Sequence, residues 1–404
     1  MQVVYERCCG LDVHKDTVVA CVLTPEGKSL RTFGTMTKDL MGLADWLADK
    51  GVAHVAMEST GVYWKAPYNL LESFEFTLLV VNARHMKAVP GRKTDMKDAE
   101  WIADLLRHGL LKASYIPSKE QRELRELVRF RRSLIRERAG VVNRIQKVLE
   151  GANIKLASVV SDVLGISGRA MIEASVAGEE NPETLAGLSK GRLRAERPTL
   201  EEALRGQVGQ HQRLVLDSLL RHVDFLDGEI ARMDQDVSAR LGSSDDVIAR
   251  LDQIPGIGRR TAEDIIAEIG LNMSRFPTSA HLASWARVCP GNNESAGKRR
   301  GSSTGSGNPW LEQALVEAAW AASRTKRSYF SALLHRLAGR RGAKRAIVAV
   351  AHAILVVIYH MILKGTHYSH LGGNYFDERN RQSVVNRAVR RIETLGYKIS
   401  LEVA

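Results

Sequence analysis

The feature that most constrains the fold is a series of short apolar segments in the first 81 residues. Five segments have the length and patterning of strands, at residues 10–14, 17–23, 29–36, 54–59 and 76–81. Apolar spacing predicts an amphipathic helix over residues 38–50, and GVYWKAPYNLLESF is expected to be helical. Three strands followed by alternating helices and strands predict an α/β domain with a mixed sheet.

The rest of the chain is predicted to be mainly helical. Residues 119–155 are rich in Arg and lack Pro, which favours one long helix, whereas Gly, Ser and Pro are scattered through residues 156–215. Apolar residues then recur at spacings of three and four, at Leu216, Leu219, Val223, Leu226, Ile230, Met233 and Val237. Such a seam is typical of a coiled coil or a helical hairpin. Its partner is either a second copy of the chain or another helix of the same domain.

A glycine-rich turn lies inside LDQIPGIGRRTAEDIIAEIG, residues 251–270, between two helical patterns. Backbone N–H groups at a helix start favour a phosphate, so this helix-hairpin-helix pattern predicts sequence-neutral contact with a nucleic-acid backbone. The alternative is a tight turn between two core helices. A polar, basic loop is expected over residues 289–309. The candidate nucleic-acid contacts in these two segments are Gly256, Gly258, Arg259, Arg260, Lys298, Arg299 and Arg300.

The net charge is +12, and much of the excess is local, because residues 318–376 contain no Asp or Glu. The cations of that stretch are Arg324, Lys326, Arg327, Arg336, Arg340, Arg341, Lys344, Arg345 and Lys364. A solvated surface normally carries charges of both signs, so this stretch indicates a polyanionic partner. Nucleic acid is the first candidate. Further candidates for phosphate contacts are Arg129, Arg131, Arg132, Arg136 and Arg138, with a solvated helix face as the alternative.

Two features bear on the cellular compartment. The four cysteines lack zinc-site spacing, and Cys8 and Cys9 are adjacent, so we expect neither a disulfide framework nor a cysteine metal site, as fits a reducing cytoplasm. The N-terminal MQVVYERCCG has no signal-peptide pattern. Residues 346–363 barely reach the length of a membrane span, and their two histidines and basic flanks favour a buried helix, so no membrane partner is expected.

Four acidic residues form a candidate metal site. Asp95 and Asp98, in KTDMKDAEWIADLL, share one face of a helix, although acids at a helix start also stabilise the helix dipole. Asp12 interrupts an apolar strand, where an unpaired acid is costly, and Glu58 ends the strand HVAME. In α/β folds, ligand-binding and active sites are commonly found at the ends of strands. Four such carboxylates can hold two Mg²⁺ ions, which together can clamp the attacking and leaving oxygens of a phosphodiester.

The order and wording of GLDVHKD, AMESTGVYW and KTDMKDAEWIADLL resemble the DEDD transposases of bacterial insertion sequences that carry a serine in their C-terminal domain. The pilin-gene invertases are relatives. The resemblance covers about residues 1–115 and 250–365. It implies a ribonuclease-H-like, RuvC-type catalytic domain at 1–115, a helical coiled-coil region at 116–250 and a mostly α-helical C-terminal transposase domain at 251–404.

The same resemblance assigns functional roles. It implies that Asp12, Glu58, Asp95 and Asp98 are the metal-binding tetrad, and that Ser295, five residues after Pro290, is the nucleophile. Ser295 would attack a DNA phosphate with the help of carboxylate-bound Mg²⁺, as in a transposase or site-specific recombinase. A bridge RNA would select the DNA sequences. The two domains would meet across protomers of a homo-oligomer, a dimer or a tetramer.

Two alternatives are open at this point. A metal-dependent nuclease of the Holliday-junction type needs the four acids but no serine, so it predicts that Ser295→Ala retains strand cleavage while Asp12→Ala loses it. A nucleic-acid-binding protein without catalysis would tolerate replacement of all four acids. The acidic motifs argue against this second alternative, because extra negative charge does not help a protein to bind DNA.

Overall fold

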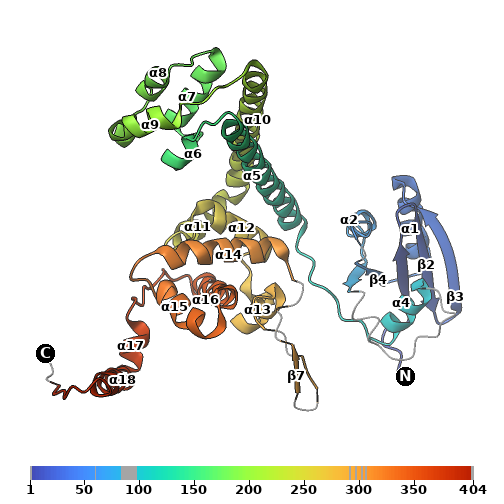
Figure 1. Ribbon diagram of the computed structural model, residues 1–404. Helices are drawn as coiled ribbons and strands as arrows, with labels where there is room; N and C mark the ends of the chain where they lie inside the picture. The colour runs from blue at the N-terminus through green and yellow to red at the C-terminus, as the bar shows by residue number, and fades with distance from the viewer. Residues whose placement is uncertain are drawn as a thin grey trace. The chain divides into compact units, whose positions relative to one another are not determined.

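The computed structural model describes residues 2–59, 61–82, 98–290, 293–295, 298–301, 304 and 307–401. The chain forms two compact units, Met1–Ser118 and Lys119–Ala404. The first is drawn in blue to cyan in Figure 1, and the second in green to red. The three-part division given above stays a prediction.

A five-stranded mixed sheet organises the first unit, with the strand order β3-β2-β1-β4-β5. The strands are β1 (Cys8–Val13), β2 (Thr17–Thr24), β3 (Gly27–Gly34), β4 (His54–Glu58) and β5 (Thr77–Val81). The first three form an antiparallel meander, and β4 and β5 continue the sheet in parallel with β1. The predicted α/β unit with a mixed sheet is therefore confirmed.

Helices cover both faces of this sheet. Helices α1 (Thr37–Asp49) and α2 (Lys65–Leu71) pack on the face formed by the odd-numbered residues of β1. Helix α4 (Asp98–Arg107) packs on the other face, directly over Gly10. A Cβ atom on Gly10 would lie 2.4 Å from the carbonyl oxygen of Ala99, so only glycine lets the start of α4 come this close to the sheet.

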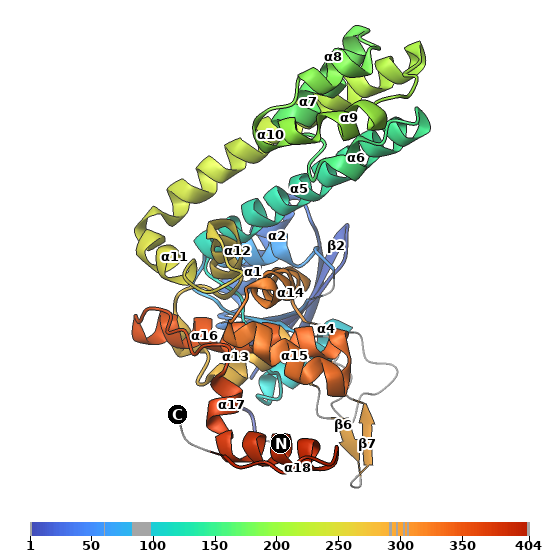
Figure 2. The same cartoon turned by 60° about the vertical axis from the view of Figure 1, so that its left-hand side comes forward.

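Two long helices form the spine of the second unit. Helix α5 (Lys119–Gly151) and helix α10 (Gln210–Leu241) lie side by side in Figures 1 and 2. The ion pairs Arg138–Asp227 and Arg240–Glu123 show that the two helices run antiparallel. The predicted seam on α10 is buried or half-buried against α5 and its neighbours. The seam therefore serves a hairpin within the chain, and a second copy would have to bind elsewhere.

Short helices cap the far end of the hairpin. They are α6 (Leu156–Val159), α7 (Ile166–Ala177), α8 (Pro182–Gly187), the 3₁₀ helix η1 (Gly191–Glu196) and α9 (Arg197–Ala203). Their apolar residues share one core with α5 and α10. The sequence shows little regularity here, because each helix is too short for its apolar period to stand out among Gly, Ser and Pro.

A helical bundle completes the second unit. It contains η2 (Gly242–Ser244), α11 (Asp245–Leu251), α12 (Arg259–Ile269), η3 (Met273–Arg275), α13 (Ser279–Ala286), α14 (Pro309–Arg324), α15 (Tyr329–Arg341) and α16 (Ala343–Lys364). By length and composition α16 could cross a membrane, but half of its most apolar stretch is buried inside the protein. It packs against α13, α14 and α15, as expected of a core helix.

Two segments extend from this bundle. The predicted loop at 289–309 contains an antiparallel hairpin, β6 (Asn293–Ser295) and β7 (Lys298–Gly301). Strands of three and four residues without a single apolar side chain, NES and KRRG, carry no apolar alternation by which they could be recognised in the sequence. At the C-terminus, α17 (Tyr375–Arg379) and α18 (Arg381–Glu393) follow α16.

Candidate active site

Asp12 and Glu58 lie on neighbouring strands at the same level of the sheet. Strands β1 and β4 pair in parallel with Leu11 opposite Met57, so the next residue on each strand is Asp12 and Glu58. Leu11 and Met57 pack into the core beneath α1 and α2, and side chains alternate along a strand. Both acids therefore belong to the face that α4 covers, at the carboxyl ends of the two parallel strands.

Asp98 belongs to the same end of that face. It is the first residue of α4, and the next residue, Ala99, lies above Gly10 of β1. Gly10 precedes Asp12 by two positions and shares its face of the strand. The fold thus brings Asp12, Glu58 and Asp98 to one region, whereas Asp95 lies outside the described residues.

The side chains in this region have the chemistry of a hard divalent-cation site. Carboxylate oxygens are the ligands that Mg²⁺ prefers. Burial raises the pKa values of Cys8 and Cys21 on the same face to about 11, so these thiols stay protonated and are poor metal ligands. Within the described ranges, no group of three or more His, Cys, Asp or Glu side chains is arranged to hold an ion. The predicted tetrad also includes Asp95, which those ranges do not contain.

His14 is a neighbour of Asp12 that the sequence analysis did not single out. Its Nε2 atom lies 3.1 Å from Oδ2 of Asp12, and the Asp12 side chain is 24% exposed. His14 lies one residue beyond the end of β1, two positions after Asp12. In the sequence, a histidine two positions after a predicted carboxylate ligand could have indicated this contact. The contact orients the Asp12 carboxylate.

Ser295 is the last residue of β6. It pairs with Lys298 across a two-residue connection, and Lys298, Arg299 and Arg300 are consecutive residues of β7. The predicted nucleophile and three predicted nucleic-acid contacts are therefore on one hairpin of the second unit, while the acids are in the first. The side chains of this hairpin lie outside the described part of the structure.

The chain segment that returns from the hairpin is held by a buried carboxylate. Asn308 caps α14 by accepting hydrogen bonds from the backbone N–H groups of Trp310 and Leu311, at 3.1 and 3.3 Å. Its amide also donates to Glu268 of α12, which is 2% exposed. Glu268 accepts two further hydrogen bonds from Arg129 of α5, at 2.7 and 2.8 Å. Glu268 thus ties α5, α12 and the start of α14 together.

The glycine-rich turn before α12 is packed against α14. Gly256 has φ of +85°, and a Cβ atom there would lie 2.3 Å from the carbonyl oxygen of Ala318 and 2.5 Å from the nitrogen of Ala322. Gly258 is the N-cap of α12, with extended backbone and no side-chain cap. Close packing therefore explains the glycine at position 256 without any need for a bound phosphate. This fits the alternative in which the motif is a tight turn between two core helices.

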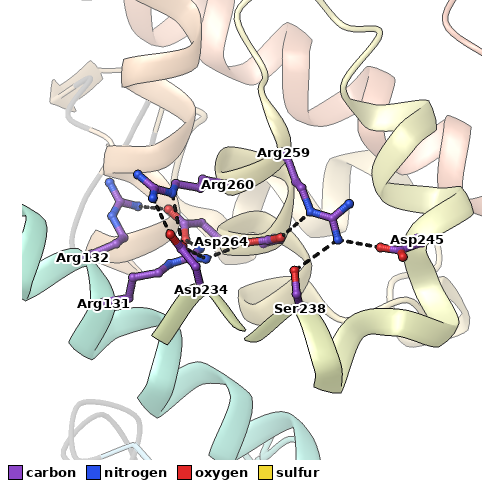
Figure 3. Close-up of polar contacts among 9 residues, drawn as sticks. Arg131, Arg132, Asp234, Ser238, Asp245, Arg259, Arg260 and Asp264 are labelled. Atoms are coloured by element: carbon purple, nitrogen blue, oxygen red, sulfur yellow. Dashed lines mark hydrogen bonds and ion pairs between the residues drawn. The ribbon is translucent and has the colours of Figure 1, made fainter. Parts of the chain in front are cut away.

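Arg259 and Arg260 are already engaged by carboxylates (Figure 3). Arg259 donates to Asp245 at 2.6 Å and to Glu263 at 3.0 Å, and the hydrogen bond that it donates to Asp245 raises the pKa of Arg259. Arg260 pairs with Asp234 of α10. A DNA phosphate would have to replace these carboxylates, so the phosphate-binding role of the two arginines stays a prediction.

The prediction of phosphate contacts on α5 is wrong for Arg131 and Arg132. Arg131 is 1% exposed and bonds to Asp234, Glu263 and Asp264 at 3.1, 2.6 and 2.8 Å. Burial opposes its charge, but the hydrogen bonds of Glu263 and Asp264 outweigh burial and raise its pKa. Arg132 is 8% exposed and pairs with Glu317 at 3.0 Å. Buried, paired guanidinium groups join helices and cannot reach a phosphate.

The other three α5 arginines also have partners within the chain. Arg129 pairs with Glu268 and Arg138 with Asp227. Arg136 lies over the ring of Trp310, with 5.7 Å between Cζ and the ring centroid, and donates to Gln313. The positive charges of α5 therefore serve packing against α10, α12 and α14 at least as much as they form a surface for nucleic acid.

A second group of cations has a different setting, where α15 ends and α16 begins. We call it the α15–α16 corner, and its members are Arg336, Arg340, Arg341, Lys344 and Arg345. All five are exposed. Among the described residues, none of them forms an ion pair shorter than 4.0 Å. No Asp or Glu occurs between residues 318 and 376 to neutralise them.

Two family models match the chain. Residues 9–154, which include the sheet, α4 and α5, match a model of the DEDD domain of IS110 elements, described as a transposase. Residues 248–335 match a model described as "Transposase IS116/IS110/IS902 family".

Curated relatives agree with this assignment. A transposase for insertion sequence element IS1111A from Coxiella burnetii is 24% identical over 370 residues, which is 90% of this chain and 91% of the relative. A probable family 20 transposase from Pseudomonas aeruginosa is 25% identical, covering 78% of this chain and 85% of the relative. An uncharacterised IS110 protein from Streptomyces coelicolor is 25% identical, covering 89% and 94%. With residues 9–154 and 248–335 matched in order, and the carboxylate motifs in the first match, the protein belongs to the IS110 family of insertion-sequence transposases, enzymes of DNA transposition.

Proposed function

We propose that this transposase cuts and rejoins DNA through Ser295, assisted by divalent metal at Asp12, Glu58, Asp95 and Asp98. The observation that supports the metal site of this proposal is the register of β1 and β4, which puts Asp12 next to Glu58 on the face covered by α4, whereas the role of Ser295 rests on membership of the family. An α/β domain with carboxylates at this edge is consistent with the ribonuclease-H-like fold that we infer for the first unit.

The serine step exchanges one phosphate ester for another. The Ser295 hydroxyl attacks a DNA phosphorus, an Oγ–P bond forms, the P–O bond to the leaving strand breaks, and the leaving oxygen takes a proton. Attack by a hydroxyl of another strand reverses the step and releases Ser295. Because the phosphate stays esterified throughout, rejoining needs no external energy source.

The carboxylates would hold one or two Mg²⁺ ions. Such ions polarise the phosphate and lower the pKa of a coordinated hydroxyl. The protein residues supply position: β1 and β4 fix Asp12 and Glu58, α4 fixes Asp98, and His14 holds one oxygen of the Asp12 carboxylate. Lys298, Arg299 and Arg300 of β7 would hold the DNA backbone beside Ser295.

Sequence selection is proposed to come from a bridge RNA that pairs with donor and target DNA. In that case the protein needs contacts with phosphates more than with base edges. Exposed cations that have no carboxylate partner among the described residues, such as those of the α15–α16 corner, would supply contacts of this kind. A homo-oligomer would bring Ser295 of one protomer to the acids of another. The seam on α10 does not serve this assembly, because α5 covers it.

The second candidate is a nuclease that uses the same metal site with water as the nucleophile. The Asp12–Glu58 register favours the two candidates equally, and the role of Ser295 separates them. A hydrolytic enzyme leaves no covalent link to DNA, whereas the serine mechanism passes through one.

The test uses cells that carry the chain with its flanking DNA, with wild-type, Ser295→Ala, Ser295→Thr and Asp12→Asn proteins. Protein–DNA complexes that resist SDS are recovered, and the linked residue is identified by mass spectrometry of the adduct. We expect an adduct on Ser295 in the wild type, none with Ser295→Ala, and none with Asp12→Asn.

The opposite results are equally specific. Strand cleavage by Ser295→Ala at the wild-type rate, with loss in Asp12→Asn, would overturn the serine mechanism in favour of hydrolysis. Adduct formation by Asp12→Asn at the wild-type rate would overturn the role of the carboxylates. Circular dichroism of each variant controls for unfolding.

A further inference from the structure

The C-terminal helix α18 buries none of its residues against the rest of the described chain. It spans Arg381–Glu393, and none of its residues is buried. Val384, Val385 and Val389 are half-buried. Ile392 is 42% exposed, and Leu395, just beyond the helix, is 71% exposed. In Figures 1 and 2 the helix lies away from the bundle, at the end of α17. An isolated helix of about 13 residues is only marginally stable in water, so a bound partner would stabilise it.

The segment is anchored to the bundle by aromatic rings. Tyr375 and Phe376 of α17 pack on Tyr329 of α15, with ring centroids 5.4 and 5.2 Å apart. The guanidinium of Arg336 lies over the Phe376 ring, with Cζ 5.3 Å from the centroid. Arg336 is also a member of the α15–α16 corner. The base of the C-terminal segment is thus attached to a helix that already carries exposed cations.

The charge of the segment indicates the chemistry of its partner. Between residues 379 and 398 there are six cations and one acid, Glu393. The cations are Arg379, Arg381, Arg387, Arg390, Arg391 and Lys398. In the part of the chain that the structure describes, none of them makes an ion pair shorter than 4.0 Å. At the helical period, Arg387, Arg390 and Arg391 fall on one side, whereas Arg381, at the start of the helix, falls on the side of Val385, Ala388 and Ile392.

Three kinds of partner can be weighed against this pattern. Pairing with α18 of a second copy would bring like charges together, which is unfavourable. Helices that lie in a membrane surface bury Trp, Phe and Leu, and RQSVVNRAVRRIE has none of these. Nucleic acid fits best, because Arg can donate two hydrogen bonds to one phosphate and all the cations of α18 are Arg.

The shape of the helix favours duplex DNA over duplex RNA. The major groove of B-DNA is about 12 Å wide and admits an α-helix, whereas that of A-form RNA is deep and narrow. A helix in a groove is contacted on both flanks, and α18 buries none of its residues against the rest of the described chain. Its non-polar face consists of Val and Ala with a single Ile, and such small side chains let the helix approach the DNA closely.

We propose that α18 is a DNA-binding arm that grips duplex DNA through Arg381, Arg387, Arg390 and Arg391, outside the segments matched by the family models. The proposal rests on DNA being the substrate of this transposase. It requires neither Ser295 chemistry nor the carboxylate site. In this arrangement the aromatic contacts of α17 hold the arm on the bundle, and the duplex orders it.

The test uses the full chain with all four arginines changed to Gln. The matched control changes four exposed arginines elsewhere, Arg192, Arg194, Arg205 and Arg232, and so removes the same charge. Binding of labelled duplex DNA is measured by fluorescence anisotropy over a range of salt concentrations. The same proteins are tested with duplex RNA of equal sequence and with vesicles of phosphatidylserine and phosphatidylcholine. Because α18 buries no residue, neither set should unfold the protein, and circular dichroism checks this.

We expect the α18 variant to bind duplex DNA at least about tenfold more weakly than the control. The slope of log K against log salt should become shallower by about 0.9 for each DNA phosphate that the variant no longer neutralises. DNA affinity equal to that of the control would overturn the proposal, and so would a loss confined to RNA or to vesicles. Adduct formation by Ser295→Ala would contradict the serine mechanism but leave this result unaffected, so the two proposals fail separately.

Discussion

Helix α5 and the α15–α16 corner are both rich in arginine, but their arginines have different surroundings. On α5, Arg129, Arg131 and Arg132 face carboxylates that α10, α12 and α14 bring to them. At the corner, the exposed cations have no acid nearby in the sequence, because residues 318–376 contain none. A cation count along one helix therefore does not identify a nucleic-acid surface. The carboxylates that packing places opposite the cations decide whether they act within the protein or outside it.

The largest effect on stability should come from removing a buried, paired arginine of α5. Arg131→Met leaves Glu263 and Asp264 without their buried cation, at an expected cost of about 3–5 kcal/mol in the free energy of unfolding. Arg340→Met at the corner should change it by less than about 0.5 kcal/mol. Urea unfolding followed by circular dichroism measures both. Equal losses for the two variants would mean that the contrast has no energetic basis.

The turn before α12 lies between the two cases, since Arg259 and Arg260 are paired but exposed. Gly256→Ala adds a Cβ atom against Ala318 at positive φ, so it should destabilise the protein by about 2–4 kcal/mol. Gly258→Ala is the control, because its Cβ would meet only Asp252, at 3.9 Å. Thermal unfolding compares them. If Gly258→Ala instead lost DNA affinity while remaining folded, the phosphate-binding interpretation of the turn would gain support.

The unpaired side of the contrast is tested by removing charge from the corner. Changing Arg340, Arg341, Lys344 and Arg345 to Gln should leave stability unchanged and weaken binding of duplex DNA about tenfold, or about 1.4 kcal/mol. Replacing Arg129 and Arg138 with Gln should do the reverse, lowering stability and leaving DNA affinity unchanged. Fluorescence anisotropy measures the DNA affinity and urea unfolding the stability of both sets of variants on the same samples. DNA affinity that survives loss of the corner cations would contradict their proposed role.

The smallest effect concerns the buried part of α16. Burial lowers the pKa of His352, and its Nδ1 atom is one of the buried atoms without a hydrogen-bond partner in the described residues. A histidine with a lowered folded-state pKa stays neutral in the fold while the unfolded chain takes up a proton. Its contribution to stability is therefore complete above its unfolded pKa and is lost as pH falls.

His352→Leu should flatten part of this acid dependence, by less than about 1 kcal/mol between about pH 7.5 and about pH 5.5. Urea unfolding at the two pH values measures the difference. His335→Leu is the control, because that imidazole is exposed on α15. A steeper loss of stability at acidic pH in His352→Leu than in the wild type would show that protonation of this half-buried imidazole stabilises the fold.

Sequence reasoning recovered the first unit well. All five strands and the helices at 37–49, 65–71 and 98–107 fall on segments that were predicted from apolar patterning. It failed at 156–209 and at the β6–β7 hairpin, where elements of three to twelve residues give no clear period. At the candidate site, the roles of Asp12, Glu58, Asp95 and Asp98 stay predictions, and the position of Asp12 beside Glu58 followed only from the parallel register of β1 and β4.

The sequence by itself determined the strands and helices with a clear apolar period, the excess of positive charge and the family, because these depend on short-range patterns and on motif order. Only the tertiary structure decided which charges neutralise each other. Arg131 and Glu263 are 132 positions apart and form a buried pair, and Leu216 packs within its own chain and not on a second copy. Such neighbours depend on the way helices pack after the chain has folded back on itself, and no local pattern specifies that arrangement.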